Sequence, residues 1–536
     1  MAEEIEVLPD PKRLIEGLRD TGYEFNTAIA DIIDNSIAAE ATLVDIQIDM
    51  DLRGDIRVSI ADNGYGMNRK DLINAMRYGS DRRQDPASLG KFGLGMKTAS
   101  TAFCRKLSVI SRISADEPTL EATWDLDHVA RERKWELLLS DTPDGDDIEH
   151  LDDIAAGRAG TVVVWRNVDR LMKAYQDPGG KPAQKALQKI IRDLREHVAM
   201  VYQRFLDQDD KRASNIDIRI NSEPVTAWDP FCKDIADLVG NQIVPAEIDN
   251  GKQAEFSVRA YILPRKEEFP DDESAKAAKL GNERQGIYIY RENRLIHDAS
   301  WLKMYSKEPH GTLLRVEFSF DHRLDDAFHI DIKKSQIILN EDLWNWLRDE
   351  FLTAPRREAN NRYRQGVKRK AKDKATGSHD QSNRNIGSKE GDLDTADITV
   401  LNPDTGECEV TNRKGQFKLK LRVVTSERPG ELFVQPVDGL DDNVLFEPAI
   451  IDGHKAVRIN TAHPYYHKVY MPNLSQGVTI QGMDSLLWGL CVAEYSTISD
   501  ATAQHFEEMR FELSRLLRKL VEDLPEPEMD EDDEAA

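Results

Sequence analysis

The sequence predicts an α/β (α+β) protein with three or four domains. It has 536 residues, and compact domains average about 150 residues. Apolar residues make up 40% of the chain, which is enough to build hydrophobic cores. Residues 1–200 alternate between the apolar spacing of helices and that of strands, which indicates a domain that mixes both.

The first domain is expected to begin with two helices. Asp10 followed by Pro11 is typical of a helix start, and a second helix is predicted at about 27–39. A turn at Gly54 lies between two segments in which apolar and polar residues alternate, so these segments should form a hairpin. The strands expected here are 44–50, 56–60, 106–112 and 161–166.

Two more folded units are expected downstream. The second spans about 215–345, because apolar residues alternate over 216–220 and 314–320, and a helix near 341–352 closes it. The third, at about 395–525, begins with strands such as 417–424 and ends in helices. Apolar residues in the last helix follow a 3-4-3-4 spacing, at Phe506, Met509, Leu513, Leu516 and Leu520. This seam is short for a coiled coil, so the helix should pack within its own domain.

A basic, flexible linker is expected at 353–394. Between 353 and 390 there are eleven Lys and Arg residues against four Asp and Glu residues. One interpretation is a solvated helix end followed by a linker. The other is an electrostatic contact with a nucleic-acid backbone, which the acidity of the rest of the chain favours.

Charge and composition exclude several classes of protein. The 72 basic and 97 acidic residues give a net charge of −25, which argues against a protein that coats nucleic acid with its whole surface. Nine acidic residues lie in 522–534, and 526–536 is expected to be an acidic tail. The four cysteines are far apart, so neither a disulfide framework nor structural zinc is expected. With no long apolar run and no signal-like start, we expect a cytoplasmic protein without membrane contact.

Two polar residues of the helix at 27–39 point to metal and water chemistry. Asp31 and Asn35 are four residues apart and therefore share one helix face. An amide oxygen is a suitable ligand for Mg²⁺, and a carboxylate can orient or deprotonate a water. The alternative is an ordinary solvated helix face.

Three further segments have the character of a nucleotide site. Asp62–Met67 follows a strand, where a carboxylate can accept from an exocyclic amine such as that of adenine and glycines let a flat ring approach. Gly90–Lys97 places three glycines and a lysine before a helix, which favours an anion site. It is neither a P-loop nor a dinucleotide fingerprint. Thr161, at the start of a predicted strand, could add a hydroxyl to the contacts with the nucleotide base. Taken singly, these segments also fit an Asn-Gly turn and a flexible loop.

In order and spacing, these four segments resemble the motifs of the GHKL superfamily (gyrase, heat-shock chaperone, histidine kinase, MutL), which shares the Bergerat ATP-binding fold. Residues 25–36 look like the first motif of the MORC branch, in which AIAELIDN is typical, and residues 90–98 look like its GQYGNGFKS. The resemblance implies an ATP-binding domain with an N-terminal arm over 1–205.

The resemblance also implies roles for single residues. Asn35 would bind Mg²⁺, and Asp62, supported by Thr161, would accept from adenine. Asp31 stands where the family usually has a catalytic glutamate, and its shorter side chain puts the turnover rate in question. The residues expected to contact nucleotide are Asn35, Asp62, Gly64, Gly66, Met67, Gly90, Lys91, Phe92, Gly93, Leu94, Gly95, Met96, Lys97 and Thr161.

Residues 206–352 resemble the S5-like transducer domain of the same superfamily. Residues 285–296 look like the GVLVYxxNRLI segment of MORC proteins. In the family this domain sends a basic residue to the γ-phosphate, and Lys334 or Lys333 is the candidate, with Lys334 preferred. Residues 395–525 resemble no family that we can name.

The resemblance therefore implies a Mg²⁺-dependent ATPase that forms an N-terminal homodimer on binding ATP and acts as a clamp. DNA, contacted through 353–374, is the expected load, in bacterial genome defence or repair, and operon-encoded protein partners are conceivable. Alternatives are a chaperone-like clamp on protein, an ATP-binding switch with negligible hydrolysis, and a histidine kinase. The kinase is disfavoured because no phospho-acceptor histidine segment precedes the ATP domain.

Overall fold

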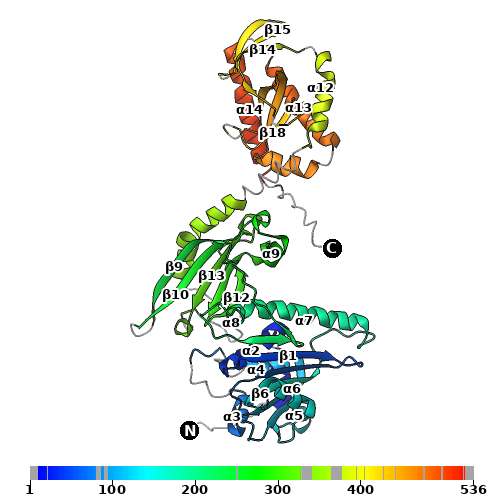
Figure 1. The fold of residues 1–536 in the computed structure, drawn as a ribbon, viewed down its shortest axis with the longest axis vertical. Helices are drawn as coiled ribbons and strands as arrows, with labels where there is room; N and C mark the ends of the chain where they lie inside the picture. Colours follow the sequence, from blue (N-terminus) through cyan, green and yellow to red (C-terminus); the bar gives the residue numbers. More distant parts are fainter. Residues whose placement is uncertain are drawn as a thin grey trace, which may run out of the picture. The chain divides into compact units, whose positions relative to one another are not determined.

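The computed structural model divides into two compact units, residues 1–360 and 361–536 (Figure 1). The residues that the structure describes are 10–20, 22–79, 86–89, 95–248, 252–325, 327–328, 341–363, 377–393, 395–403, 405–426, 428–440, 442, 444–474, 477–495, 499–522 and 524.

An eight-stranded sheet forms the centre of the first domain. Its strand order is β5-β4-β3-β6-β2-β1-β7-β8. The bounds are β1 (Leu43–Met50), β2 (Ile56–Asp62), β3 (Cys104–Arg112), β4 (Leu120–Asp125), β5 (Leu138–Ser140), β6 (Gly160–Val168), β7 (Asp217–Ile220) and β8 (Glu223–Pro224). β1 and β2 form the expected hairpin, with Val44 opposite Asp62 and Met50 opposite Ile56.

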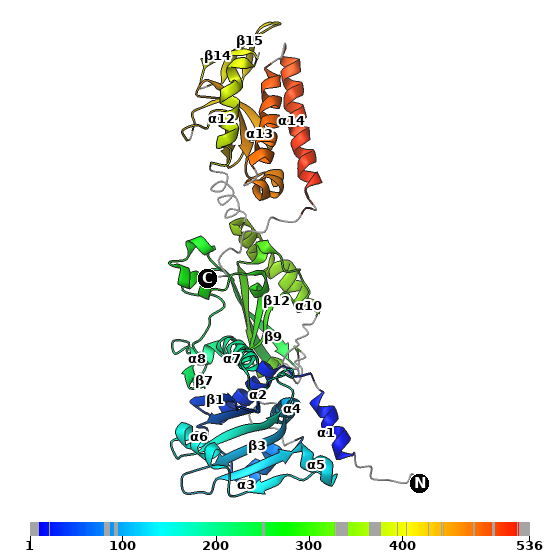
Figure 2. The ribbon, with the colours of Figure 1, turned by 90° about the vertical axis from the view of Figure 1, so that its right-hand side faces the viewer.

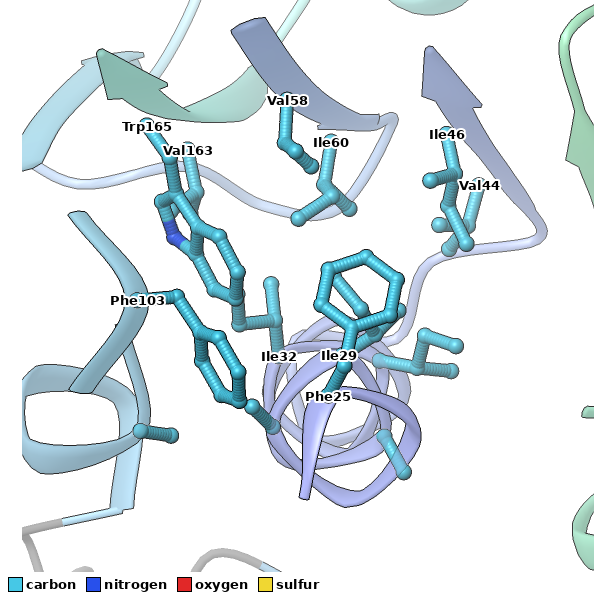
Figure 3. Packing of buried hydrophobic residues seen from close by; sticks show 14 of the residues in the cluster. Phe25, Ile29, Ile32, Val44, Ile46, Val58, Ile60, Phe103, Val163 and Trp165 are labelled. Carbon is cyan, nitrogen blue, oxygen red and sulfur yellow. The ribbon is translucent and has the colours of Figure 1, made fainter. Parts of the chain in front are cut away.

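Helices cover both faces of this sheet. They are α1 (Pro11–Arg19), α2 (Phe25–Ala38), α3 (Arg69–Met76), α4 (Gly95–Phe103), α5 (Leu126–Glu132), α6 (Gly145–Ala155), α7 (Lys181–Val201) and α8 (Gln203–Leu206). Side chains alternate between the faces of a strand, so Ile60 packs with Ile29 and Ile32 of α2 (Figure 3). Its neighbour Ala61 packs with Leu151 of α6 on the other face. The predicted helix and strands of this domain are thus confirmed.

The strand predicted at 216–220, which was expected to begin the second domain, belongs instead to the sheet of the first domain. β7 pairs in parallel with β1, and Ile218 lies opposite Val44. Local alternation reveals a strand but not its partner, and the partner here is far away in the sequence. The sheet of the first domain therefore extends to Pro224, beyond the boundary expected at 205.

A five-stranded sheet of order β12-β11-β13-β10-β9 forms the second domain. Its strands are β9 (Asp237–Ile248), β10 (Lys252–Ile262), β11 (Gly286–Arg291), β12 (Arg294–Ser300) and β13 (Leu314–Phe320). Short helices join them: η2 (Lys266–Glu268), α9 (Asp272–Ala277), η3 (Asn282–Arg284), η4 (Pro309–Gly311) and η5 (His322–Leu324). As predicted, helical turns at α10 (Glu341–Asn345) and η6 (Trp346–Phe351) close the unit, with Leu347 and Phe351 in the core.

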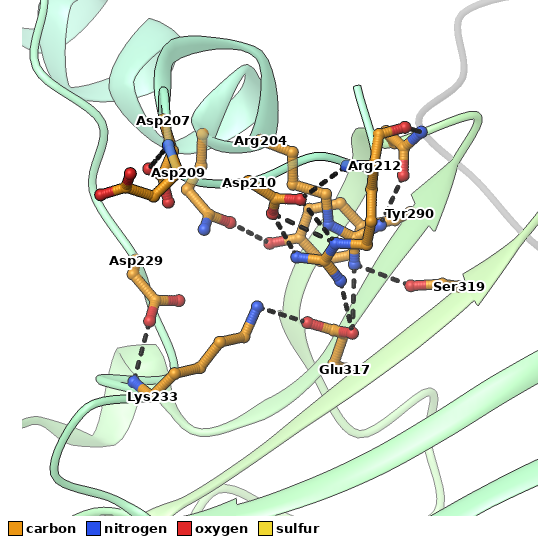
Figure 4. A network of polar contacts seen from close by, with 12 residues as sticks. Arg204, Asp207, Asp209, Asp210, Arg212, Asp229, Lys233, Tyr290, Glu317 and Ser319 are labelled. Atoms are coloured by element: carbon orange, nitrogen blue, oxygen red, sulfur yellow. Dashed lines mark hydrogen bonds and ion pairs between the residues drawn. The ribbon is translucent and has the colours of Figure 1, made fainter. Parts of the chain in front are cut away.

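Within the compact unit 1–360, a buried carboxylate joins the first domain to the second (Figure 4). Glu317 of β13 has no exposed surface and pairs with Arg204 of α8 at 3.3 Å and Lys233 at 3.0 Å. Arg212 and Arg259 each lie 3.1 Å from the same side chain. Burial alone would raise the pKa of Glu317, but these cations lower it to about 2.

The described residues of the compact unit 361–536 form two sheets, and the long helices α12, α13 and α14 pack with them (Figure 2). One sheet is β14 (Asp397–Asn402), β15 (Glu407–Asn412) and β16 (Gly415–Lys420). The other, of order β17-β19-β20-β18, contains β17 (Arg422–Val424), β18 (Val434–Val437), β19 (Phe446–Ile451) and β20 (His454–Asn460). The helices are α12 (Asp380–Lys389), η7 (Glu390–Asp392), η9 (Tyr466–Tyr470), η10 (Met471–Asn473), α13 (Gly477–Glu494) and α14 (Asp500–Leu520).

Two expectations for this unit need correction. Part of the predicted linker is the helix α12, whose buried Asn383 bonds the backbone of Val434 and Phe433. The last helix packs within its own domain as expected, but it does so through Leu513 and Leu517. Leu520 of the predicted seam is 75% exposed, so the buried face is rotated from that seam. Within the described part of the chain, no helix combines the length and apolar character that crossing a bilayer requires.

Candidate functional site

The helix α2 holds the two polar residues singled out in the sequence. Phe25, its first residue, packs edge-on against Phe103 and Trp165, and Ile29 and Ile32 attach the helix to the sheet. Asp31 and Asn35 lie one turn apart, and Asn35 Nδ2 donates to the Asp31 carbonyl at 2.8 Å. This bond assigns the amide nitrogen to the backbone, so the amide oxygen is the atom suited to a metal.

Asp31 is confined by two neighbours. The Tyr23 hydroxyl donates to Asp31 Oδ2 at 3.1 Å. Gly95, the first residue of α4, lies so close that an added Cβ would be 3.1 Å from the same oxygen. Sequence reasoning did not identify Tyr23, because it precedes α2 and no helical spacing relates it to Asp31. A carboxylate has the chemistry to orient a water, and these two contacts restrict where this one can point.

Asp34, next to Asn35, has a different environment. It is fully buried, and its Oδ1 accepts from Arg294 Nε of β12 and from the Tyr202 hydroxyl, both at 2.8 Å. It therefore belongs to the contact between the two domains.

The predicted base-binding carboxylate, Asp62, is buried at the end of β2. Its Oδ2 accepts from the Ser36 hydroxyl at 2.8 Å, and its Oδ1 accepts from the Gly64 amide at 3.0 Å. Burial raises the pKa of Asp62 to about 6, although bonds from Gly64, Ser36 and Thr161 oppose this shift. A buried carboxylate of this kind can accept from an amine in a setting that water does not screen.

Thr161 lies directly opposite Asp62 in the β2–β6 register, so the two predicted contacts come together. Ser111 of β3 connects them to the turn after β2. Its hydroxyl lies 2.9 Å from Thr161 Oγ1, donates to the Gly160 carbonyl at 3.0 Å and accepts from the Met67 amide at 2.9 Å. Sequence reasoning missed Ser111, which lies in no glycine-rich segment and becomes informative only through strand pairing.

The two glycines of the turn after β2 lie where a side chain would not fit. Gly66 has φ +67°, and an added Cβ would be 1.9 Å from the Arg112 carbonyl oxygen. At Gly64 an added Cβ would be 2.7 Å from the Ala39 carbonyl oxygen. Both positions therefore require glycine, because neighbouring backbone carbonyls fill the space that a side chain would need.

Lys97 is placed differently from the other predicted residues. It is buried in α4, and its Nζ donates to the Ala75 carbonyl of α3 at 2.8 Å. Burial lowers the pKa of Lys97 to about 8. Its neighbour Met96 packs against the core. Gly90, Lys91, Phe92, Gly93 and Leu94 lie outside the described residues, as do Lys333 and Lys334.

These residues fit an adenine nucleotide and a hard cation. A buried carboxylate at the end of β2 suits an exocyclic amine, to which it can offer an acceptor. An amide oxygen one turn from a carboxylate is a donor set that Mg²⁺ prefers.

Comparisons with known proteins find an ATPase family over part of the chain. A family described as histidine kinase-, DNA gyrase B- and HSP90-like ATPase matches residues 23–161. The mouse (Mus musculus) protein ATPase MORC2B is 38% identical over 77 residues, which span 14% of this chain and 8% of that relative's length. The crystal structure of the N-terminal domain of a DNA repair protein is similar at 16% identity and a TM-score of 0.39, covering 67% of this chain and 98% of that chain. This chain therefore carries a GHKL-type ATPase domain at residues 23–161 and has MORC-like relatives.

Proposed function

We propose that this domain binds ATP with Mg²⁺ and hydrolyses it. The observation that carries the proposal is the meeting of two sets of residues on α2 and the strands beside it. Adenine would bind at the end of β2, where Ser36 and Gly64 donate to Asp62. Asp31, one turn from Asn35 on α2, lies beside the first residue of α4.

Recognition of the base would rest on Asp62 and the turn after it. The carboxylate would accept from the adenine amine, and Ser36 and Gly64 hold its two oxygens in place for this contact. Ser111 would keep Thr161 and the Met67 amide in register with it. Gly66 would hold the turn against β3, because only glycine fits beside the Arg112 carbonyl.

Hydrolysis would rest on α2. Asn35 would hold the magnesium ion, which when bound neutralises charge on the phosphates. Asp31 would orient the attacking water, and Tyr23 fixes the rotamer of that carboxylate. The roles of Gly90–Leu94, Lys97, Lys333 and Lys334 toward the phosphates remain predictions.

Phosphate release and nucleotide titration test this proposal. We expect wild type to release phosphate with Mg²⁺, Asp62→Asn to bind nucleotide more weakly, and Asn35→Ala to lose Mg²⁺-dependent turnover. Asp127→Asn, a change at an exposed carboxylate of α5, is the matched control and should behave as wild type. The absence of nucleotide binding by wild type would refute the proposal.

An ATP-binding switch with negligible hydrolysis is the second candidate, and the shorter reach of Asp31 favours it. If wild type and Asp31→Ala release phosphate at the same slow rate while both bind ATP, the switch is correct. If Asp31→Ala abolishes a faster wild-type rate, Asp31 is the residue that orients water.

We further propose that ATP drives N-terminal homodimerisation and that the dimer acts as a clamp on DNA, with the basic segment 353–374 as a contact. Arg356 of this segment stacks on Tyr305, 3.5 Å from the ring centre, so the contact would lie further along the chain. Replacing Arg364, Lys368, Arg369 and Lys370 by Gln should weaken DNA binding and flatten its salt dependence. Replacing the exposed cations Lys181, Lys185, Lys189 and Arg192 of α7 is the control of equal charge. Equal effects of both sets would favour a clamp that acts on protein.

A further inference from the structure

The hairpin formed by β11 and β12 reaches from the second domain into the nucleotide domain. Its turn consists of Glu292 and Asn293, which have φ of 46° and 68°. Arg291 and Arg294 flank this turn, and both side chains are buried. Two buried guanidinium groups on one turn are costly unless each has acceptors.

Arg294 finds its acceptor on the helix that carries the proposed chemistry. Its Nε donates to Asp34 Oδ1 at 2.8 Å. The Tyr202 hydroxyl lies 2.8 Å from the same oxygen and 2.7 Å from the Ala30 carbonyl. Since Asp34 lies between Asp31 and Asn35 in the sequence, these contacts fix the rotation of that turn of α2.

Charge couples Arg294 to the same turn. Burial alone would lower the pKa of Arg294, but the nearby Asp34, Tyr202 and Asp31 raise it above its ordinary value. The guanidinium is therefore charged at every physiological pH, and it is close enough to Asp31 to interact with that carboxylate.

Arg291 makes a second contact from the other side of the turn. Its Nε and Nη2 bind the two oxygens of Asp325 at 2.6 and 2.8 Å. The same guanidinium lies 3.3 Å from the Pro86 carbonyl and 3.5 Å from the Ser88 carbonyl. Ser88 lies two residues before the glycine-rich segment in the sequence, so this hairpin contacts the nucleotide domain at two separate places.

We propose that Arg294 is a positioning residue for ATP hydrolysis, through which the transducer-like sheet holds Asp31 and Asn35 in their working geometry. This inference rests on the function proposed above. In the proposed function Arg294 contacts neither the nucleotide nor the attacking water, and it acts through its bond with Asp34. A mere attachment between domains would affect stability, whereas a positioning residue affects turnover.

The test compares Arg294→Gln and Arg294→Lys with Arg259→Gln. Arg259 is the matched control, because it also pairs with a buried carboxylate, Glu317. Unlike Arg294 and Asp34, Arg259 and Glu317 lie in the same sheet, the transducer-like one. For Arg294→Gln we expect kcat to fall about 10- to 100-fold, as for other residues that orient a catalytic group, with KM within about threefold. Arg294→Lys should recover part of kcat, because it restores the charge without the planar fork.

Amide hydrogen exchange of residues 25–38 in the nucleotide-free chain supplies a second readout. Arg294→Gln should speed exchange in α2, and Arg259→Gln should leave it unchanged. If Arg294→Gln does not fold, the double variant with Asp34→Asn is used in its place. It removes the buried carboxylate charge that loses its guanidinium partner in the single variant.

The outcomes separate the two proposals. Equal kcat for Arg294→Gln and Arg259→Gln overturns the positioning role. If wild type does not hydrolyse ATP, the proposed function fails, and α2 exchange then decides whether Arg294 holds that helix. Unchanged exchange in α2 overturns the inference, whether or not the chain is an ATPase.

Discussion

Under the proposed function, Asp62 would make nucleotide binding sensitive to pH. Its carboxyl group has a pKa of about 6 because burial disfavours the charged form, and the charged form is the stronger acceptor for the adenine amine. We therefore expect affinity for an adenine nucleotide to be constant above this pKa and to fall about tenfold for each pH unit below it. Calorimetric titration from about pH 5 to pH 8 measures this.

The same shift acts on stability with the opposite sign. The pKa of Asp62 in the folded chain is raised above the ordinary value of an aspartate, so the nucleotide-free fold gains stability from this group as pH falls through about 6. Asp62→Asn should bind weakly at every pH and show no such slope. A slope that survives in this variant would assign the pH dependence to another group.

Gly66 offers a sharp test of the base site. Gly66→Ala would place a Cβ 1.9 Å from the Arg112 carbonyl oxygen, so the turn after β2 must move and nucleotide binding should be lost. The matched control is Gly79→Ala, because Gly79 has a similar φ of +73° and its added Cβ meets nothing within 4 Å. Gly79→Ala should lose about 1–2 kcal/mol from left-handed strain, and Gly66→Ala should lose more because of the clash, both measured by thermal unfolding. Only Gly66→Ala should lose nucleotide in calorimetry.

Single residues of the site differ in how far the sequence could predict them. Asp62 and Thr161 fall in recognisable segments, and strand pairing places them opposite each other. Tyr23 and Ser111 carry no local signal, because their roles depend on atoms that distant strands and helices bring near. Lys97 was correctly placed at a helix start, but its burial under α3 could not be predicted from spacing.

At the scale of elements, β3 should matter for nucleotide binding through one hydroxyl. Ser111→Ala removes the bonds to Thr161, Gly160 and Met67, and we expect affinity to fall about fivefold to tenfold. Ser108→Ala, in the same strand, removes a buried bond to Thr123 at 2.8 Å and serves as the control. Both should lose about 1 kcal/mol of unfolding free energy. Equal affinities of the two variants would exclude a role for Ser111 in base binding.

Elements with strong periodicity were predictable, and elements defined by distant partners were not. The helix expected at 27–39 is α2, and the strands of the first sheet lie close to their expected bounds. β7 was misplaced because parallel pairing with β1 leaves no local trace. α12 was taken for linker because its Ser and Asn residues look solvated. In the structure Ser382 donates to Asp484 at 2.5 Å inside the core.

At the scale of the whole molecule, the proposal predicts a change of mass. Light scattering should show a monomer without nucleotide and a doubled mass with a non-hydrolysable ATP analogue, because ATP would drive the N-terminal domains together. Asp62→Asn, which should not hold the analogue, is the control. A mass that is the same with and without the analogue, in a chain that binds it by calorimetry, would leave an ATPase without this form of dimerisation.

The ring of cations around Glu317 has a practical consequence for anyone who wishes to shorten this chain. A cut after residue 205 would remove Glu317 from Arg204 and Arg294 from Asp34. Arg204 and Asp34, which are buried in the whole chain, would then lack their oppositely charged partners. Such a fragment should precipitate or unfold even though it contains every residue of the proposed base site. The smallest soluble piece is therefore expected to end near residue 360, where the first compact unit ends.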